Sequence, residues 1–159
     1  MKPNSELIGL ILRNINVIHH FFGENNAIEK GREEAQELID VIDSQNKYEL
    51  LMELADCIIV AARSDFSEIT VFGRLLESDV ASYVFNYYEK HKDIKGALED
   101  VISGKYELCL HLLYSYALSK FPKQELIKAI LYKTTRTTQR IHYGYYDYNI
   151  DLKKDRKNV

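Results

Sequence analysis

Two pairs of carboxylates in the first third of the chain have the spacing of a metal site. Glu34 and Glu37 lie three residues apart. Glu53 and Asp56 repeat that spacing, so each pair shares one face of a helix. Gln45 is the midpoint of both pairings across the chain, so an antiparallel hairpin that turns there brings all four acids to one level. Four hard oxygen ligands favour Mg²⁺ or Mn²⁺ over zinc.

The helices that would position these pairs follow from the apolar pattern. One is expected from about 25 to 44 and the next from about 48 to 63, with the polar turn 44–46 between them. At about 100° per residue, Glu34 points into the apolar stripe of the first helix. The window 50–62, LLMELADCIIVAA, is apolar nearly all round, which is typical of a buried helix. Because buried carboxylates are costly unless they are paired or bind metal, a metal site is favoured over a solvated acidic face.

A basic helix face near the C-terminus offers the complementary charge. Lys133, Arg136 and Arg140 follow i, i+3, i+7 spacing in a helix that is expected to start near Pro122. Such cations would neutralise the parts of a triphosphate that a metal leaves uncovered. Lys and Arg also collect at helix C-termini because of the helix dipole. The phosphate-binding interpretation therefore depends on the acidic pairs.

These two features together resemble a known family. The order E-x-x-E, fifteen residues, E-x-x-D on a helical hairpin is similar to the signature of the all-α nucleoside triphosphate pyrophosphohydrolases, the MazG-like and dimeric dUTPase superfamily. Lys30, three positions before Glu33 and Glu34, matches the K-x-x-E-E beginning that is common in MazG-like chains. The basic helix resembles the family pattern K-x-x-x-N-x-x-R, but Thr137 stands at the asparagine position.

The resemblance implies a Mg²⁺-dependent enzyme, with Mn²⁺ as a substitute, that hydrolyses a nucleoside or deoxynucleoside triphosphate to the monophosphate and pyrophosphate. It also implies a homodimer or homotetramer. Glu33 or a ligand carboxylate would take the proton of the attacking water. The predicted catalytic residues are Glu33, Glu34, Glu37, Glu53 and Asp56, the last four as metal ligands, and the predicted substrate-binding residues are Lys30, Lys133, Arg136, Arg140, His142, Tyr143 and Asn14.

A third group of residues is expected to contact the base. His142, Tyr143, Tyr145 and Tyr146 could stack on a base or ribose, although tyrosines near a chain end also pack on the bundle or on a partner subunit. Asn14 is included because related folds place base contacts on the first helix. The alternative function is a non-catalytic helical module that keeps the fold and binds a nucleotide or a protein.

A middle segment has no counterpart in the resemblance. In compact MazG domains the basic helix soon follows the second carboxylate pair, so residues 65–120 are interpreted as a helical insertion. The insertion lies within a single all-α domain over 1–146, and 147–159 form a basic tail. The insertion could cover the site, extend the core or replace the elements that form a dimer.

Helix boundaries outside the hairpin are also predicted. The first helix should run from residue 4 or 5 to a break near Phe22 and Gly23. Within the insertion, helices are expected over roughly 69–90, 94–102 and 106–119.

Composition sets the class of protein. A chain of 159 residues with 46% hydrophobic residues can form one domain with its own core. Seven glycines and two prolines give too few turns for a β-sandwich or barrel, so an all-α helical bundle is predicted. No apolar run reaches the roughly 18 residues of a membrane helix, so we expect a soluble, cytoplasmic protein.

The charge distribution bears on possible partners. The net charge is −3, but residues 120–159 hold ten Lys and Arg against four acids, a balance of +6. The first 119 residues therefore carry −3 − 6 = −9. An acidic chain overall argues against a broad nucleic-acid footprint. An acidic metal site that faces a basic phosphate site explains the same asymmetry.

Overall fold

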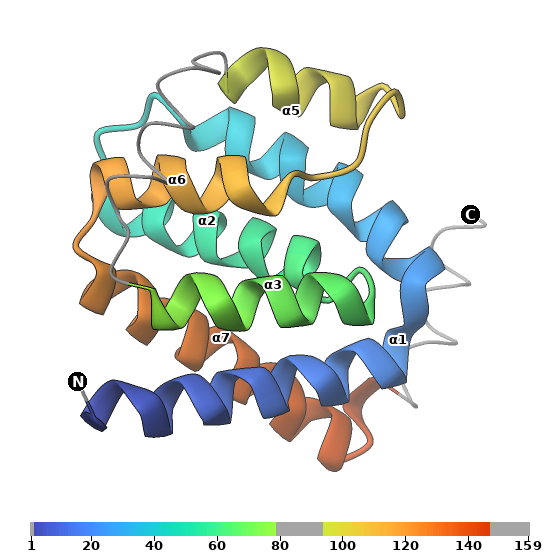
Figure 1. Cartoon of the computed structure of the whole chain (residues 1–159). Coiled ribbons are helices and arrows are strands. Elements are labelled where there is room, and N and C mark those ends of the chain that lie inside the picture. Colours follow the sequence, from blue (N-terminus) through green and yellow to red (C-terminus); the bar gives the residue numbers. More distant parts are fainter. Residues whose placement is uncertain (1, 79–93, 147–159) are drawn as a thin grey trace.

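The computed structural model describes residues 2–78 and 94–146, and these form an all-α bundle without strands (Figure 1). The predicted fold class is therefore confirmed, whereas the predicted tail 147–159 lies outside the described residues. None of the helices in the described ranges has the length and apolar character needed to cross a bilayer. The helices are α1 (Lys2–Val41), α2 (Lys47–Ala62), α3 (Phe66–Glu77), α5 (Ile94–Ile102), α6 (Leu110–Lys120) and α7 (Lys123–His142).

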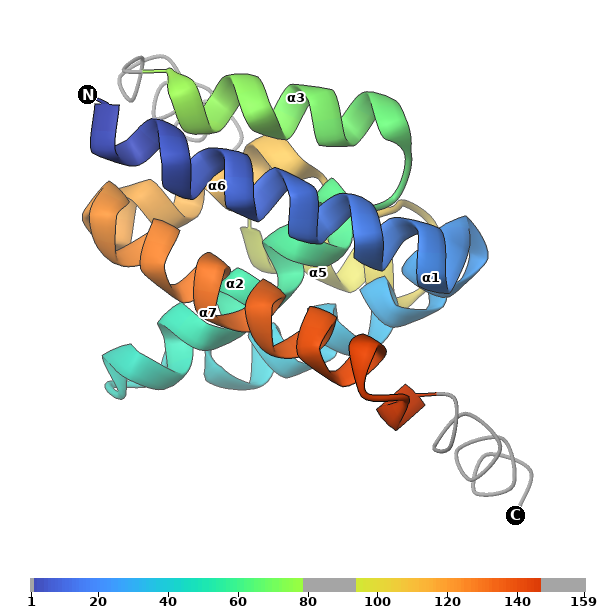
Figure 2. The same ribbon diagram turned by 90° about the horizontal axis from the view of Figure 1, so that it is seen from below.

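Helix α1 is broken into two arms at Gly23. The backbone there has φ 82° and ψ 173°, a conformation that in practice only glycine adopts. The break confirms the helix end predicted near Phe22 and Gly23. Residues 2–22, the N-terminal arm, lie along α7, whereas residues 24–41, the second arm, turn away to pack on α2 (Figures 1 and 2).

The second arm and α2 form the predicted helical hairpin. The connection between Val41 and Lys47 is held by local hydrogen bonds. The side chain of Asn46 caps α2 by accepting from the backbone N–H of Glu49 at 3.1 Å, and the hydroxyl of Ser44 accepts from the N–H of Asn46 at 3.0 Å. The first helix of the hairpin ends at Val41, three residues before the predicted position. The turn begins there, because the N–H of Ser44 donates to the carbonyl of Val41 at 2.8 Å.

The described part of the middle segment, 65–78 and 94–120, builds core. Phe72 of α3, Leu98 of α5, and Leu113 and Tyr114 of α6 are all at most 2% exposed and belong to the main apolar cluster. Helices α5 and α3 pack on α1, and α6 packs on α2. Among the three roles considered for the 65–120 insertion, the packing favours extension of the core.

The boundaries of two helices in this segment, α3 and α6, differ from the prediction. Helix α3 begins at Phe66 rather than near 69, because the side chain of Asp65 accepts from the N–H of Glu68 at 2.8 Å and caps the helix. It ends at Glu77, and the remainder of the predicted helix, 79–90, lies outside the described residues.

Helix α6 begins at Leu110, four residues later than expected. The chain leaves α5 through a turn at Gly104, which has φ 82°, and the N–H groups of Lys105 and Tyr106 both donate to the carbonyl of Asp100. These backbone bonds occupy the residues at which a helix from 106 would have to start.

Candidate metal and phosphate site

Three of the four predicted carboxylates meet between the two helices of the hairpin. Glu34 and Glu37 of α1 and Glu53 of α2 each offer an oxygen, and these oxygens lie within 4.8 Å of one another. Glu34 is only 5% exposed, Glu53 is half-buried and Glu37 is exposed. The hairpin therefore brings together carboxylates from both helices at one level, as the sequence spacing predicts for these three residues.

The fourth carboxylate faces a different neighbour. Asp56 lies outside the trio, and its Oδ2 is 3.0 Å from the Nζ of Lys133 on α7. Burial raises the pKa of Asp56, and the nearby Lys133 ammonium opposes that shift. Asp56 thus links the acidic hairpin to the basic helix.

Two oxygens of the cluster are buried without a hydrogen-bond partner. They are Oε2 of Glu34 and Oε2 of Glu53. Burial, and then the charge of Asp56, raises the pKa of Glu34 to about 8 and that of Glu53 to about 7. A buried acceptor that lacks a partner is costly, and a hard divalent cation coordinated by carboxylate oxygens would relieve that cost. The donor set therefore fits Mg²⁺ or Mn²⁺.

Lys30 lies at the N-terminal side of the same cluster. Its Nζ is 3.2 Å from Oε2 of Glu33 and 3.5 Å from Oε1 of Glu34. Burial alone would lower the pKa of Lys30, but the charges of Glu34 and Glu33 outweigh burial and raise it. The K-x-x-E-E sequence thus places one cation against two acids at the rim of the cluster.

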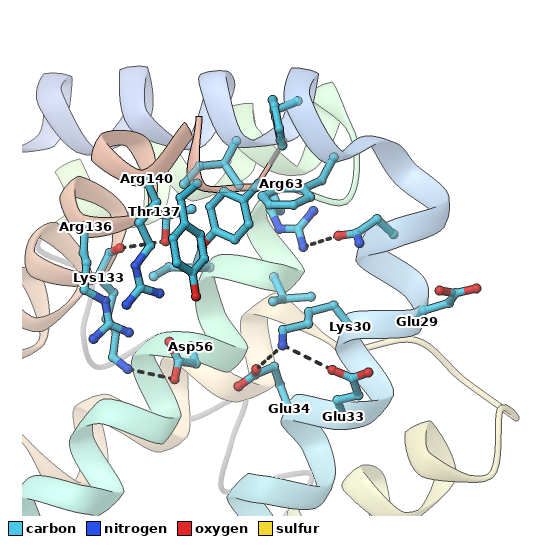
Figure 3. Close-up of a pocket in the computed structure, with 18 residues that line it drawn as sticks. Glu29, Lys30, Glu33, Glu34, Asp56, Arg63, Lys133, Arg136, Thr137 and Arg140 are labelled. Atoms are coloured by element: carbon cyan, nitrogen blue, oxygen red, sulfur yellow. Dashed lines mark hydrogen bonds and ion pairs between the residues drawn. The ribbon is translucent and has the colours of Figure 1, made fainter. Parts of the chain in front are cut away.

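Helix α7 presents the predicted basic face towards Asp56. Lys133, Arg136 and Arg140 follow one another along the helix on the side of the pocket opposite Lys30 (Figure 3). The Nε of Arg136 is buried and has no hydrogen-bond partner. Thr137 donates its hydroxyl to the carbonyl of Lys133 at 3.0 Å. Thr137 is therefore bonded to its own helix.

Both charged faces open into one pocket of about 770 Å³ between α1, α2 and α7. A pocket of this size lies within the range that holds a small-molecule ligand. Of the acidic cluster only Glu34 lines the pocket, together with the neighbouring Asp56, whereas Glu37 and Glu53 lie behind the lining. The lining residues are Ile18, Phe21, Phe22, Asn26, Glu29, Lys30, Glu33, Glu34, Asp56, Ile59, Val60, Arg63, Lys133, Arg136, Thr137, Arg140, Tyr145 and Tyr146.

Three predicted base-contacting residues lie outside this lining. Asn14 is buried between α1 and α7, where its amide nitrogen donates to the hydroxyls of Thr134 and Thr135 at 3.2 and 3.3 Å. His142 and Tyr143 are exposed at the end of α7. The structure therefore separates these three residues from the acidic and basic faces.

The other two stacking candidates, Tyr145 and Tyr146, do reach the far end of the pocket. Gly144, with φ 73°, redirects the chain after α7, so that Tyr145 and Tyr146 line the pocket. Phe22 and Arg63 line the same end, and the sequence analysis did not select either of them. A signal for Arg63 was present, because it is the charge that directly follows the apolar window of α2.

The described part of the middle segment, 65–78 and 94–120, contributes no residue to this pocket. The pocket is thus a property of the hairpin, the N-terminal arm and α7. In comparisons with known proteins, no family model, no curated protein and no solved structure matches this chain. The chemistry of the pocket must therefore be deduced from its own residues.

Proposed function

We propose that the protein hydrolyses a nucleoside or deoxynucleoside triphosphate to the monophosphate and pyrophosphate, with Mg²⁺ or Mn²⁺ as cofactor. The observation that carries the proposal is one pocket with two opposed charged faces, which are joined by the 3.0 Å contact between Asp56 and Lys133. The proposal would place the chain among the MazG-like pyrophosphohydrolases, whose signature its carboxylate pairs resemble.

The acidic face would hold the metal. Glu34, Glu37 and Glu53 offer oxygens close enough to share one ion, and two of these residues have an unpaired buried oxygen. The bound ion would lower the pKa of a water molecule and offset phosphate charge. Glu33, beside Lys30 at the rim, would accept the proton of the attacking water.

The basic face would hold the phosphates. The buried Nε of Arg136 has no partner, so a phosphate oxygen would supply the acceptor that it lacks. Lys133 and Arg140 lie on the same side of the pocket and would neutralise charge that develops on the pyrophosphate leaving group (Figure 3). Lys30, across the pocket, would add a fourth cation.

Product analysis with matched variants tests this proposal. Purified protein with Mg²⁺ is incubated with ribo- and deoxynucleoside triphosphates, and the products are separated by ion-exchange chromatography. We expect monophosphate and pyrophosphate in equal amounts from the wild type. Turnover should fall by at least about a hundredfold in Glu34→Gln, because a charged ligand is lost. Glu99→Gln, on the exposed face of α5, is the control and should keep full activity.

A second candidate function is nucleotide binding without turnover. It is favoured by the pairing of Asp56 with Lys133, which engages one of the four predicted ligands. Under this alternative, a folded protein that binds Mg²⁺ would bind nucleoside triphosphates and yield no product from any of them. That outcome of the product analysis would overturn the hydrolase proposal.

The resemblance also supports a cytoplasmic homodimer or homotetramer as part of this proposal. Neither Cys57 nor Cys109, the two cysteines of the sequence, forms a disulfide, in keeping with a reducing compartment. Sedimentation equilibrium of the full chain gives the oligomeric state directly. A monomer at all concentrations would remove this part of the proposal without affecting the assignment of the pocket.

A further inference from the structure

Arg63 is a buried cation whose hydrogen bonding is incomplete. It follows α2 as its C-cap residue and is only 4% exposed. One terminal nitrogen, Nη2, donates to Oδ1 of Asn26 at 2.7 Å. The other, Nη1, is buried without any hydrogen-bond partner. Within the described ranges no carboxylate forms an ion pair with Arg63. A guanidinium in this position requires an acceptor.

One aromatic ring lies against this guanidinium at the end of the pocket, and a second ring adjoins the first. The Cζ of Arg63 lies 5.2 Å from the centre of the Phe22 ring. The Tyr146 ring lies 5.0 Å from the same Phe22 ring and 6.1 Å from that of Phe21. In Figure 3, Arg63 lies across the pocket from Lys133 and Asp56. This end of the pocket is therefore lined by aromatic side chains on which a nucleobase would stack.

The polar groups at this end offer donors to a ligand. Arginine has five N–H donors and no acceptor. The Oδ1 of Asn26 is already engaged by Arg63, so the group that Asn26 has left to offer is its N–H₂. Guanine and hypoxanthine present two adjacent acceptors, O6 and N7, which match an arginine fork. Adenine carries an amino group in place of O6, and that donor would face the donors of Arg63.

We propose that this end of the pocket binds the base of the nucleotide, and that Arg63 selects a 6-oxopurine over adenine. The assignment rests on the proposed function, because it takes the ligand of the pocket to be a nucleotide. Uracil and thymine are less suitable partners, since O4 has no second acceptor beside it on the same edge. Asn26 is a positioning residue, because it fixes the orientation of the guanidinium.

Binding of nucleoside monophosphates tests the inference without requiring catalysis. Titration calorimetry of the full chain in EDTA compares GMP, IMP, AMP and UMP. GMP and IMP should each bind at least about tenfold more tightly than AMP or UMP, the difference expected of one bidentate contact. Equal affinity for GMP and AMP, tighter binding of UMP, or no binding of any of the four would overturn the inference.

Two variants and a control separate base selection from simple charge attraction. Arg63→Lys keeps the charge and removes the fork, so GMP should weaken to the affinity of AMP while AMP changes less than about threefold. Asn26→Ala should also reduce the preference for GMP. Arg74→Lys, at an exposed position of α3, should change neither affinity. A parallel weakening of GMP and AMP in Arg63→Lys would indicate a phosphate contact and contradict base selection.

The two proposals fail in different ways. If the hydrolase proposal is wrong, triphosphates are not cleaved, but GMP still binds more tightly than AMP in an Arg63-dependent manner. If base selection is wrong, cleavage of triphosphates proceeds with kcat/KM values for GTP and ATP that are alike in the wild type and in Arg63→Lys.

Discussion

The middle segment and the pocket side of the bundle differ in whether their buried polar groups have hydrogen-bond partners. In α6, the buried hydroxyl of Ser115 donates to the carbonyl of His111 at 2.7 Å. The Tyr114 hydroxyl donates to a backbone carbonyl of α3 at 3.4 Å. On the pocket side, by contrast, buried oxygens of Glu34 and Glu53 have no partner.

This difference separates stability from function within one small domain. The described part of the middle segment packs apolar side chains and pairs the hydroxyls of Tyr114 and Ser115 with backbone carbonyls, so it stabilises the folded state. The pocket side keeps like charges together at a cost to folding, and a bound cation would relieve that cost. Truncation of an apolar side chain in the middle segment should therefore lower the free energy of unfolding. Added metal should raise it through the pocket side.

The largest effect on stability is expected from the apolar region. Phe72 is 0% exposed and packs with its ring centre 6.3 Å from that of Tyr114. Phe72→Ala should lower the free energy of unfolding by about 3–5 kcal/mol, measured by urea denaturation. Phe66→Ala removes a ring that is 57% exposed and should cost much less. Equal losses in the two variants would show that α3 does not contribute core packing as described.

Added metal should stabilise the pocket side. Mg²⁺ at a hundred times its Kd should raise the free energy of unfolding of the wild type by about 2.7 kcal/mol, because the ion binds the folded state. The matching rise in Tm is measured by calorimetry with and without EDTA. Glu53→Gln should gain much less, since it removes one of the clustered carboxylates. Equal gains in wild type and variant would place the metal elsewhere.

The metal-free protein should lose stability as the pH rises. Glu34, with a pKa of about 8, and Glu53, with a pKa of about 7, hold protons in the folded state that the unfolded chain releases near its ordinary value of 4.5. Between these limits the folded state binds more protons, so the free energy of unfolding falls by at most about 1.4 kcal/mol per pH unit for each extra proton.

Denaturation in EDTA at pH 5, 6, 7 and 8 measures this dependence. Glu34→Gln carries no titrating group at that position, so its stability should fall less steeply than that of the wild type, and it should be the more stable protein at pH 8. Saturating Mg²⁺ should flatten the slope of the wild type, because it keeps the carboxylates ionised. A wild-type slope that is unchanged in Glu34→Gln would show that Glu34 titrates normally.

The smallest effect concerns Asn14. Its amide joins α1 to α7 through Thr134 and Thr135, so Asn14→Ala should cost about 1 kcal/mol of stability. The preference for GMP over AMP should not change, since Asn14 lies outside the pocket lining. Chemical denaturation and nucleotide titration of the same variant give both quantities. A selective loss of GMP binding would show that Asn14 contributes to base binding.

The hairpin was predictable because its signals are local. The spacing of Glu34, Glu37 and Glu53 around a short polar turn depends only on helix geometry. Asp56 was predicted at the same level, but it lies 60° around α2 from Glu53, since three residues rotate a helix by about 300°. Glu34 and Glu37 have the same offset and stay together, so Asp56 differs because Lys133 of α7 lies beside it, a long-range contact that spacing along one helix does not reveal.

The far end of the pocket was not predictable because its contacts are not local. Arg63 is buried by Phe22 and Asn26, which lie on opposite sides of the break at Gly23. The direction of the chain after that break is set by tertiary packing. The choice of Tyr145 and Tyr146 over the preceding tyrosine similarly depends on the single turn at Gly144.

The identity of the cleaved phosphate bond tests the central claim most directly. Phosphorus NMR of the full chain with Mg²⁺ and a nucleoside triphosphate resolves pyrophosphate, inorganic phosphate and the nucleotide products in one spectrum. The proposed function predicts that monophosphate and pyrophosphate appear together, and that the formation of both falls by at least about a hundredfold in Glu34→Gln. Appearance of diphosphate and inorganic phosphate, or an unchanged triphosphate spectrum with folded, metal-bound protein, would contradict it.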